Sequence, residues 1–183
     1  MKNYAPVPQT GQTKCFDPFS LSEISCTDTG QDGDLQKGVT WPVPRFTDNS
    51  NGTVTDNLTG LMWTKDIEQI KGLMTWADAL TACNNLVFAG HDDWLLPNVK
   101  ELQSLFDYRG VNPALPSGHP FIINEQMMTL FASGSEVWFW SNTSAGWDLV
   151  HPFAFMVLMN SGRVEYYFKN WGDIFVWPVR GGK

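Results

Sequence analysis

The sequence predicts an α+β fold, and three patterns lead to that prediction. Two tight turns lie close together at 49–52 and 56–60, where Asn, Asp and Gly tolerate positive φ and close antiparallel hairpins. Two later segments, 75–86 and 98–106, carry the caps and the apolar spacing of helices. Beyond residue 136 the chain returns to the alternating apolar pattern of strands.

Short strands are predicted around the two turns, at 53–55 and 61–63. The helices are predicted from their first turns. Thr75 is followed three residues later by Asp78, and Asn98 is followed in the same way by Glu101. Apolar side chains then fall along one face of each segment: Trp76, Leu80 and Cys83 in the first, and Leu102, Leu105 and Phe106 in the second.

The C-terminal third predicts a second set of strands. A strand at 137–140 precedes a hairpin whose arms are 153–159 and 163–168, and 174–179 is expected to close the sheet. The first arm of the hairpin is apolar on both faces, which indicates either a central strand or a strand covered by a second subunit. We favour the central position. Between the helices and these strands, 125–131 is expected to form a short helix.

Composition suits one domain with an extension. Residues 1–44 are rich in Pro, Gly, Thr and Asp and read as a loop-rich extension, and 45–183 form the domain. The net charge of −7 disfavours nucleic acid, anionic membranes and sulfated polysaccharides as partners. No apolar run approaches the roughly 20 residues of a membrane span, so membrane insertion is not expected.

Cysteine usage points to one disulfide. Cys15 and Cys26 flank a short polar segment, and closing that loop would stabilise the fold by about 3 kcal/mol. Cys83 lies within the first predicted helix and is expected to act as a small buried hydrophobe. A nucleophilic role for Cys83 is disfavoured because no His or Lys stands near it in the sequence.

The sequence gives little support for a metal site or a catalytic site. The Asp-rich stretch 28–34 resembles half of a calcium loop, but Val39 stands where the bidentate Glu is expected. A solvated turn is favoured there, with a structural calcium ion as the alternative; no other cofactor is expected. His91, His119 and His151 are far apart, and no metal-ligand spacing or nucleophile motif occurs. We therefore expect no enzymatic activity.

Four segments, 45–63, 93–102, 140–143 and 177–182, together resemble the Lcl C-terminal domain family, and we call them the family segments. This is a bacterial family long catalogued as a domain of unknown function. The resemblance spans 45–182 and implies a C-type-lectin-like fold, with a twisted antiparallel sheet flanked by two helices. It also implies an exported protein that is extracellular, on the cell surface or periplasmic. Residues 1–6 carry no hydrophobic signal core.

The C-type-lectin-like superfamily includes calcium-dependent lectins and formylglycine-generating enzymes, and the chain lacks the defining residues of both. The chain has no counterpart of the Glu-Pro-Asn triplet that binds calcium in C-type lectins, and only a partial echo of their Trp-Asn-Asp strand at 140–142. The cysteine pair of the related formylglycine-generating enzymes is missing, since no Cys follows Cys83. Trp177 stands where the family more often has Arg, which predicts a surface adapted to apolar contact.

A binding surface remains as the predicted function. Two polar loops, 142–151 and 166–173, carry aromatic side chains beside amides and carboxylates, which suits sugars and protein patches alike. The partner would be a glycan or a surface protein, bound without lectin-type calcium. The alternative is a self-assembling structural module of a cell-surface, pilus-like or phage-related protein, including a retroelement-diversified display protein. The predicted ligand-binding residues are Trp147, Asp148, His151, Tyr167, Lys169, Asn170, Trp171 and Asp173, and the alternative for Trp147 and Trp171 is that they cover the core.

Overall fold

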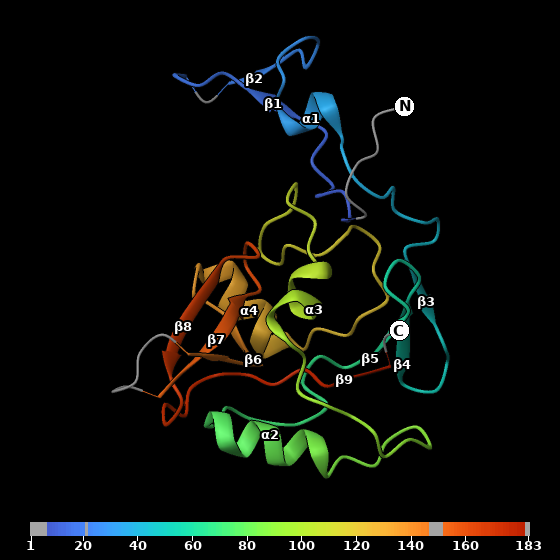
Figure 1. The fold of residues 1–183 in the computed structure, drawn as a ribbon, viewed down its shortest axis with the longest axis vertical. Coiled ribbons are helices and arrows are strands. Elements are labelled where there is room, and N and C mark those ends of the chain that lie inside the picture. The colour runs from blue at the N-terminus through green and yellow to red at the C-terminus, as the bar shows by residue number, and fades with distance from the viewer. Residues whose placement is uncertain (1–6, 21, 147–151, 182–183) are drawn as a thin grey trace.

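The fold is described from a computed structural model, which describes residues 7–20, 22–146 and 152–181. It has a small N-terminal unit, two antiparallel sheets and three further helices (Figure 1). The elements are β1 (Cys15–Phe16), β2 (Glu23–Ile24), α1 (Asp32–Leu35), β3 (Phe46–Asp48), β4 (Thr53–Asp56), β5 (Leu61–Thr64), α2 (Trp76–Asn84), α3 (Val99–Ser104), α4 (Glu125–Ser133), β6 (Trp138–Ala145), β7 (Phe153–Leu158), β8 (Val164–Phe168) and β9 (Val179–Gly181).

The first sheet has the order β3-β4-β5-β9, and Asp56 organises the turn between β4 and β5. Its carboxylate accepts hydrogen bonds from the Leu58 amide at 2.9 Å and the Thr59 hydroxyl at 2.8 Å. It also accepts from the Arg45 guanidinium at 2.8 and 2.9 Å, and both side chains are buried. Arg45 donates further to the Ser104 carbonyl at 2.8 Å, which attaches α3 to this sheet. The two hairpins predicted from the turn residues are both present.

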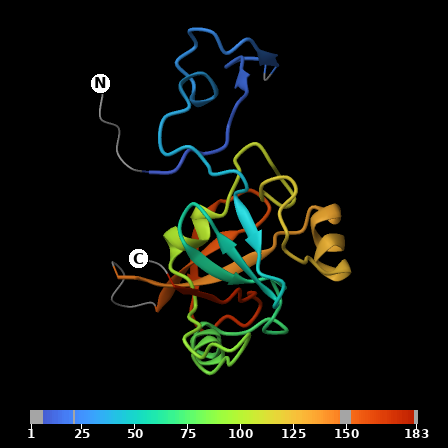
Figure 2. The same ribbon diagram turned by 90° about the vertical axis from the view of Figure 1, so that its right-hand side faces the viewer.

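The helices begin at the predicted residues. Thr75 accepts a hydrogen bond from the Asp78 amide at the start of α2. Asn98 and Glu101 form a reciprocal capping box at the start of α3, which satisfies amides that would otherwise lack a partner. The short helix expected at 125–131 is α4, capped by Asn124. Figure 2 shows α4 standing out from the side of the domain, away from α2.

The second sheet has the order β6-β7-β8, so the strand that is apolar on both faces is central, as predicted. One face packs on the main core through Phe139 and Val157. The other face packs on α2, where Trp140, Met156 and Ala154 lie in one cluster with Ala79 and Cys83. Both faces of β7 are thus buried by helices and loops of the same chain.

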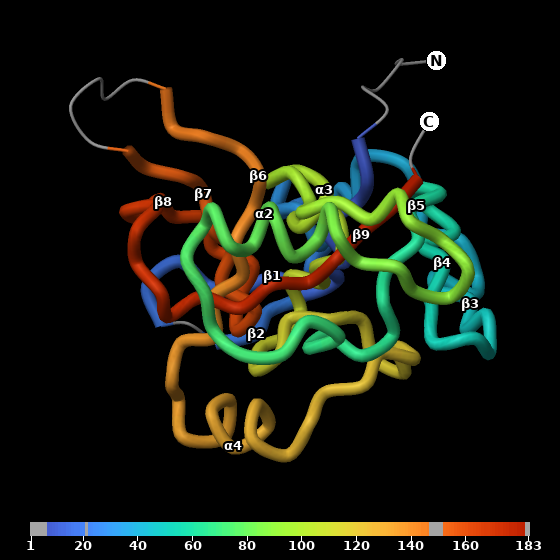
Figure 3. Tube along the Cα trace, turned by 90° about the horizontal axis from the view of Figure 1, so that it is seen from below, coloured from blue at the N-terminus to red at the C-terminus, as the bar shows by residue number. Residues whose placement is uncertain are grey.

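The prediction that 174–179 forms one strand that closes the sheet is wrong. Regular pairing is confined to β9, which runs antiparallel to β5. Upstream of it, Ile174 and Phe175 form only isolated bridges, to Met74 and Phe139 respectively. The chain between β8 and β9 therefore passes from one sheet to the other above α2 (Figures 1 and 3). It cannot be one regular strand because it has to join both sheets.

Trp177 lies at this crossing, and the prediction that it forms an apolar surface is wrong. Its side chain is 0% exposed, and its indole N–H donates to the Thr64 carbonyl at 3.0 Å. The ring packs against Trp63 of β5 with centroids 5.2 Å apart and against Phe139 of β6 at 5.9 Å. Phe121 completes the cluster at 4.8 Å. An aromatic residue here fills the space between the two sheets.

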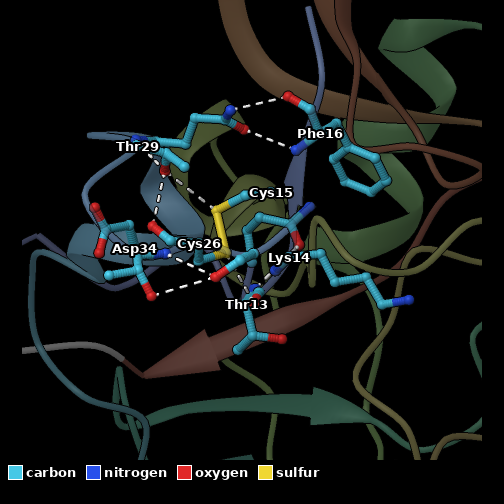
Figure 4. Close-up of a disulfide and its surroundings, with 12 residues drawn as sticks. Thr13, Lys14, Cys15, Phe16, Cys26, Thr29 and Asp34 are labelled. Atoms are coloured by element: carbon cyan, nitrogen blue, oxygen red, sulfur yellow. Dashed lines mark hydrogen bonds between the residues drawn. A yellow bond between two sulfur atoms is a disulfide. The ribbon is translucent and has the colours of Figure 1, made fainter. Parts of the chain in front are cut away.

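The N-terminal unit stands apart from the sheets in Figures 1 and 2. Cys15 and Cys26 form a disulfide across the β1–β2 hairpin, and Thr29 and Asp34 lie beside it (Figure 4). Asp34 accepts from the Gly30 amide at 3.0 Å, and the Asp32 carboxylate accepts from the Thr10 hydroxyl. The stretch compared with a calcium loop is thus a turn followed by the single turn of α1, with these two carboxylates hydrogen bonded.

Replacement of Trp177 by Ala should lower the free energy of unfolding by about 3–5 kcal/mol, the usual cost of truncating a large buried aromatic side chain. Chemical denaturation followed by circular dichroism measures this loss. Trp171→Ala is the matched control, because Trp171 is 46% exposed, and we expect a loss of about 1 kcal/mol or less. Similar losses in the two variants would show that Trp177 is not a core residue.

Candidate functional site

The C-terminal half carries an open groove made of two adjoining hollows. One hollow has a volume of about 540 Å³ and the other about 710 Å³, and both are lined by Glu136, Trp138 and Asp173. The walls come from β6, β7, β8, the segment after β8, the beginning and middle of α4, and the segment 68–73 between β5 and α2. The remaining lining residues of the first hollow are Met156, Glu165, Tyr166, Tyr167, Trp171 and Ile174; those of the second are Glu68, Lys71, Gly72, Leu73, Asn124, Gln126, Leu130 and Phe175.

Tyr167, Trp171 and Asp173 line the first hollow together, and we call these three residues the aromatic corner. The Trp171 amide donates to the Phe168 carbonyl at 3.0 Å, and this turn after β8 folds the chain back. The Trp171 and Tyr167 rings then meet at 5.2 Å with an interplanar angle of 82°. The two rings thus stand nearly perpendicular, with Asp173 lining the same hollow.

The polar side-chain atoms of the aromatic corner form no hydrogen bond with the part of the chain that the structure describes. Among the residues that the structure describes, none hydrogen bonds to the Trp171 indole N–H, the Tyr167 hydroxyl or the Asp173 carboxylate. Buried aromatic residues with polar groups normally find a partner within the protein. Here the three residues line one hollow, and Trp171 and Asp173 are exposed, so a ligand in the hollow can reach them.

Trp138 forms the wall between the two hollows. The Arg163 guanidinium carbon lies 5.1 Å from its ring centroid, a cation–π geometry. Arg163 also pairs with Glu136 at 2.7 Å and with Glu165 at 3.6 Å. The Trp138 indole N–H donates to Glu136 at 3.1 Å. These contacts hold Trp138 and both carboxylates in fixed positions along the groove.

The predicted site residues divide into three groups. Tyr167, Trp171 and Asp173 lie together in the aromatic corner. Lys169 does not line the groove: its Nζ lies 3.9 Å from the Trp76 ring centroid and donates to the Ser144 hydroxyl at 2.7 Å, so it connects the end of β8 to α2 and β6. Asn170 is exposed in the turn but lines neither hollow. Trp147, Asp148 and His151 lie outside the described residues.

The first predicted loop, 142–151, needs a correction at its start, because β6 continues through Ala145. The Asn142 amide donates to the Pro97 carbonyl at 2.7 Å, and its side-chain amide donates to the Leu96 carbonyl at 2.8 Å. Polar residues that read as loop are therefore satisfying the backbone of the segment that enters α3. These residues resembled a loop because their composition does not show that they bond to the backbone of Leu96 and Pro97, which is remote in the sequence.

Sequence reasoning missed Glu136, Trp138 and Glu165 as groove residues. The alternation of 163–168 places Glu165 on the same face as Tyr167, so that pattern was available. Trp138 gave no such sign, because it lies in a strand whose other members are mostly buried. Its position beside the groove depends on the segment after β8, which is remote in sequence.

Outside the groove, burial shifts the pKa of two titratable side chains, Cys83 and His119. Burial raises the pKa of the Cys83 thiol to about 12, which leaves it protonated and unreactive near neutral pH. Burial also lowers the pKa of His119, whose ring packs beside Phe121 at 5.7 Å. Within the described residues, no three His, Cys, Asp or Glu side chains converge on a point that could hold a metal ion. No described helix is both long and apolar enough to cross a membrane.

The family segments meet one another rather than the groove. Arg180 near the C-terminus forms a two-point ion pair with Asp93, at 2.6 and 2.9 Å, and this contact lowers the pKa of the Asp93 carboxyl. Leu95 bridges to Val179 beside it. With the contacts of Asn142 and Trp177, all four segments are joined to at least one other.

The molecule is therefore a mixed α and β domain with two antiparallel sheets, whose distinctive segments hold those sheets together. The chain belongs to the Lcl C-terminal domain family: the model of this family matches residues 52–180. The resemblance seen in the sequence is thus confirmed. Comparison with curated proteins finds no match.

The ion pair of Asp93 and Arg180 should make stability depend on pH. Because the pKa of Asp93 is lowered in the folded state, its contribution is complete above the ordinary aspartate pKa of about 3.9 and is lost as the pH falls below it. The stability difference between the native protein and Asp93→Asn should therefore shrink between about pH 5 and pH 3. Thermal melting at each pH measures it.

Asp92→Asn is the control for this experiment, since Asp92 is an exposed neighbour that forms no ion pair with a described residue. It should follow the native protein across the pH range. An Asp93→Asn variant with the same acid sensitivity as the native protein would show that the ion pair does not contribute.

Proposed function

We propose that this domain is a non-catalytic, exported binding module that recognises a glycan or a surface protein through the groove. The observation that carries the proposal is the aromatic corner. Tyr167, Trp171 and Asp173 contribute two aromatic rings and three polar groups to one hollow, and no described residue hydrogen bonds to those groups, while the family segments are occupied in holding the sheets together. Exposed aromatic planes beside polar groups are the usual composition of a recognition surface.

A glycan is the better-supported ligand of the two. The groove extends over two hollows that share Glu136, Trp138 and Asp173, which gives room for more than one sugar ring. Flat rings suit the C–H faces of sugars, and the indole N–H and phenol hydroxyl beside them can bond to sugar hydroxyl groups. We expect no lectin-type calcium requirement, because the chain lacks the triplet that supplies the calcium ligands in C-type lectins.

A C-type-lectin-like fold is part of the proposal. Its support is the order of elements: a hairpin-rich sheet, the helices α2 and α3 followed by the short α4, and a second set of strands after which the chain returns to pair with the first sheet through β9. In that architecture the C-terminal half carries the ligand loops, which agrees with the place of the groove. Export is supported by the disulfide between Cys15 and Cys26, because such bonds persist in oxidising compartments.

Self-assembly is the second candidate function, and one observation favours it. Phe153 and Phe168 pack at 4.5 Å, and Tyr166 meets Phe155 and Phe153 on the same face of β7 and β8. Tyr166 and Phe168 remain partly exposed in this aromatic patch. A second copy of the chain could cover such a patch, although paired aromatic side chains on an edge strand are also ordinary sheet stabilisation.

A glycan array probed with the purified chain, with calcium and again with EDTA, tests the proposed function. We expect a defined set of hits that survive EDTA and that are lost or weakened at least about tenfold in Trp171→Ala, since one central aromatic often carries more than 1.4 kcal/mol. Phe19→Ala is the control, because Phe19 is a fully exposed aromatic residue in the N-terminal unit, remote from the groove.

The outcome separates the two candidates. Hits that are unchanged in Trp171→Ala would place binding elsewhere. A chain that binds nothing but sediments as a concentration-dependent oligomer would favour self-assembly through the aromatic patch.

A further inference from the structure

We infer that the groove selects a positively charged glycan: a linear hexosamine polymer that carries free amino groups. This inference rests on the proposed function, because it names the ligand class for the same groove. It is argued from the charge of the lining residues and from the polar groups of the aromatic corner.

The groove is lined by four carboxylates, those of Glu68, Glu136, Glu165 and Asp173. Among the described lining residues one is a cation, Lys71, and its ammonium is paired with Asp66 at 2.8 Å. The groove is therefore negative, as is the chain as a whole, with a net charge of −7. A negative groove with apolar walls attracts a cationic ligand and repels an anionic one.

The two cations close to the aromatic corner in sequence do not neutralise it. Arg163 bridges Glu136 and Glu165, so these three groups together keep one negative charge. Lys169 is held over the Trp76 ring and bonded to Ser144. Asp173 is left without an ion pair or hydrogen bond among the described residues. The ammonium group of a ligand could form an ion pair with the Asp173 carboxylate.

The aromatic corner favours an amino sugar over a lysine-rich peptide. A hexosamine ring can lay its C–H face on Trp171 or Tyr167 while its amino group, at the ring edge, reaches the carboxylate. Its hydroxyl groups can accept from the indole N–H and exchange hydrogen bonds with the phenol. A lysine side chain offers an ammonium for an ion pair or cation–π contact, and only the peptide backbone could supply partners for the indole N–H and the phenol hydroxyl, whereas an amino sugar carries all of these groups on one ring.

Calorimetric titration with a glucosamine hexamer and with its fully N-acetylated counterpart tests the inference, since acetylation removes the charge and keeps the rings. We expect the free-amine hexamer to bind at least about tenfold more tightly in low salt, with the difference falling as salt is added. Asp173→Asn should weaken binding of the free-amine hexamer several-fold and leave the acetylated one unchanged. Trp171→Ala should weaken both, and Phe19→Ala neither.

The outcomes separate this inference from the proposed function. Equal affinity for the two hexamers, or preferred binding of other neutral glycans on the array, would overturn the charge selection and leave the binding module in place. Tighter binding of oligolysine than of the free-amine hexamer would overturn it in favour of a peptide ligand. Absence of binding to any glycan would overturn both. Melting curves of each variant show whether a loss of affinity reflects loss of the fold.

Discussion

The packing of Trp177 between the two sheets is the contact on which the rest of the domain depends. Its indole bonds to Thr64 in the first sheet and its ring touches Phe139 in the second, so one side chain sets their relative position. It also fixes the crossing segment that precedes β9. Because Trp171 and Asp173 lie at the start of that segment, the groove exists only when the crossing is in place.

This arrangement divides the residues of the domain between two tasks. The family segments supply the contacts that close the fold: the buried pair of Arg45 and Asp56, the pair of Asp93 and Arg180, and the bonds of Asn142. The groove is lined instead by side chains between those segments. Of these, Trp171 and Asp173 form no hydrogen bond or ion pair with a family segment among the described residues, so they can be changed without removing such a contact.

Local features of the fold were predictable because local chemistry determines them. The turns at 49–52 and 56–60 need residues that tolerate positive φ, and the starts of α2 and α3 need side chains that accept from free amides, so both could be read from the sequence. Long-range contacts could not be predicted in this way. Whether Trp177 is buried depends on Trp63 and Phe139, which nothing in its own neighbourhood specifies. The same is true of Lys169: its charge suits ligand binding, but its side chain packs on Trp76.

Hydrogen exchange of the Trp177 indole N–H, followed by NMR together with the backbone amides, tests the central role of this contact most directly. If Trp177 holds the sheets together, its indole should exchange only through global unfolding. Its opening free energy should then equal that of the most protected amides in β5 and β6. Faster exchange of the indole, with those amides still fully protected, would mean that the two sheets are held together without it.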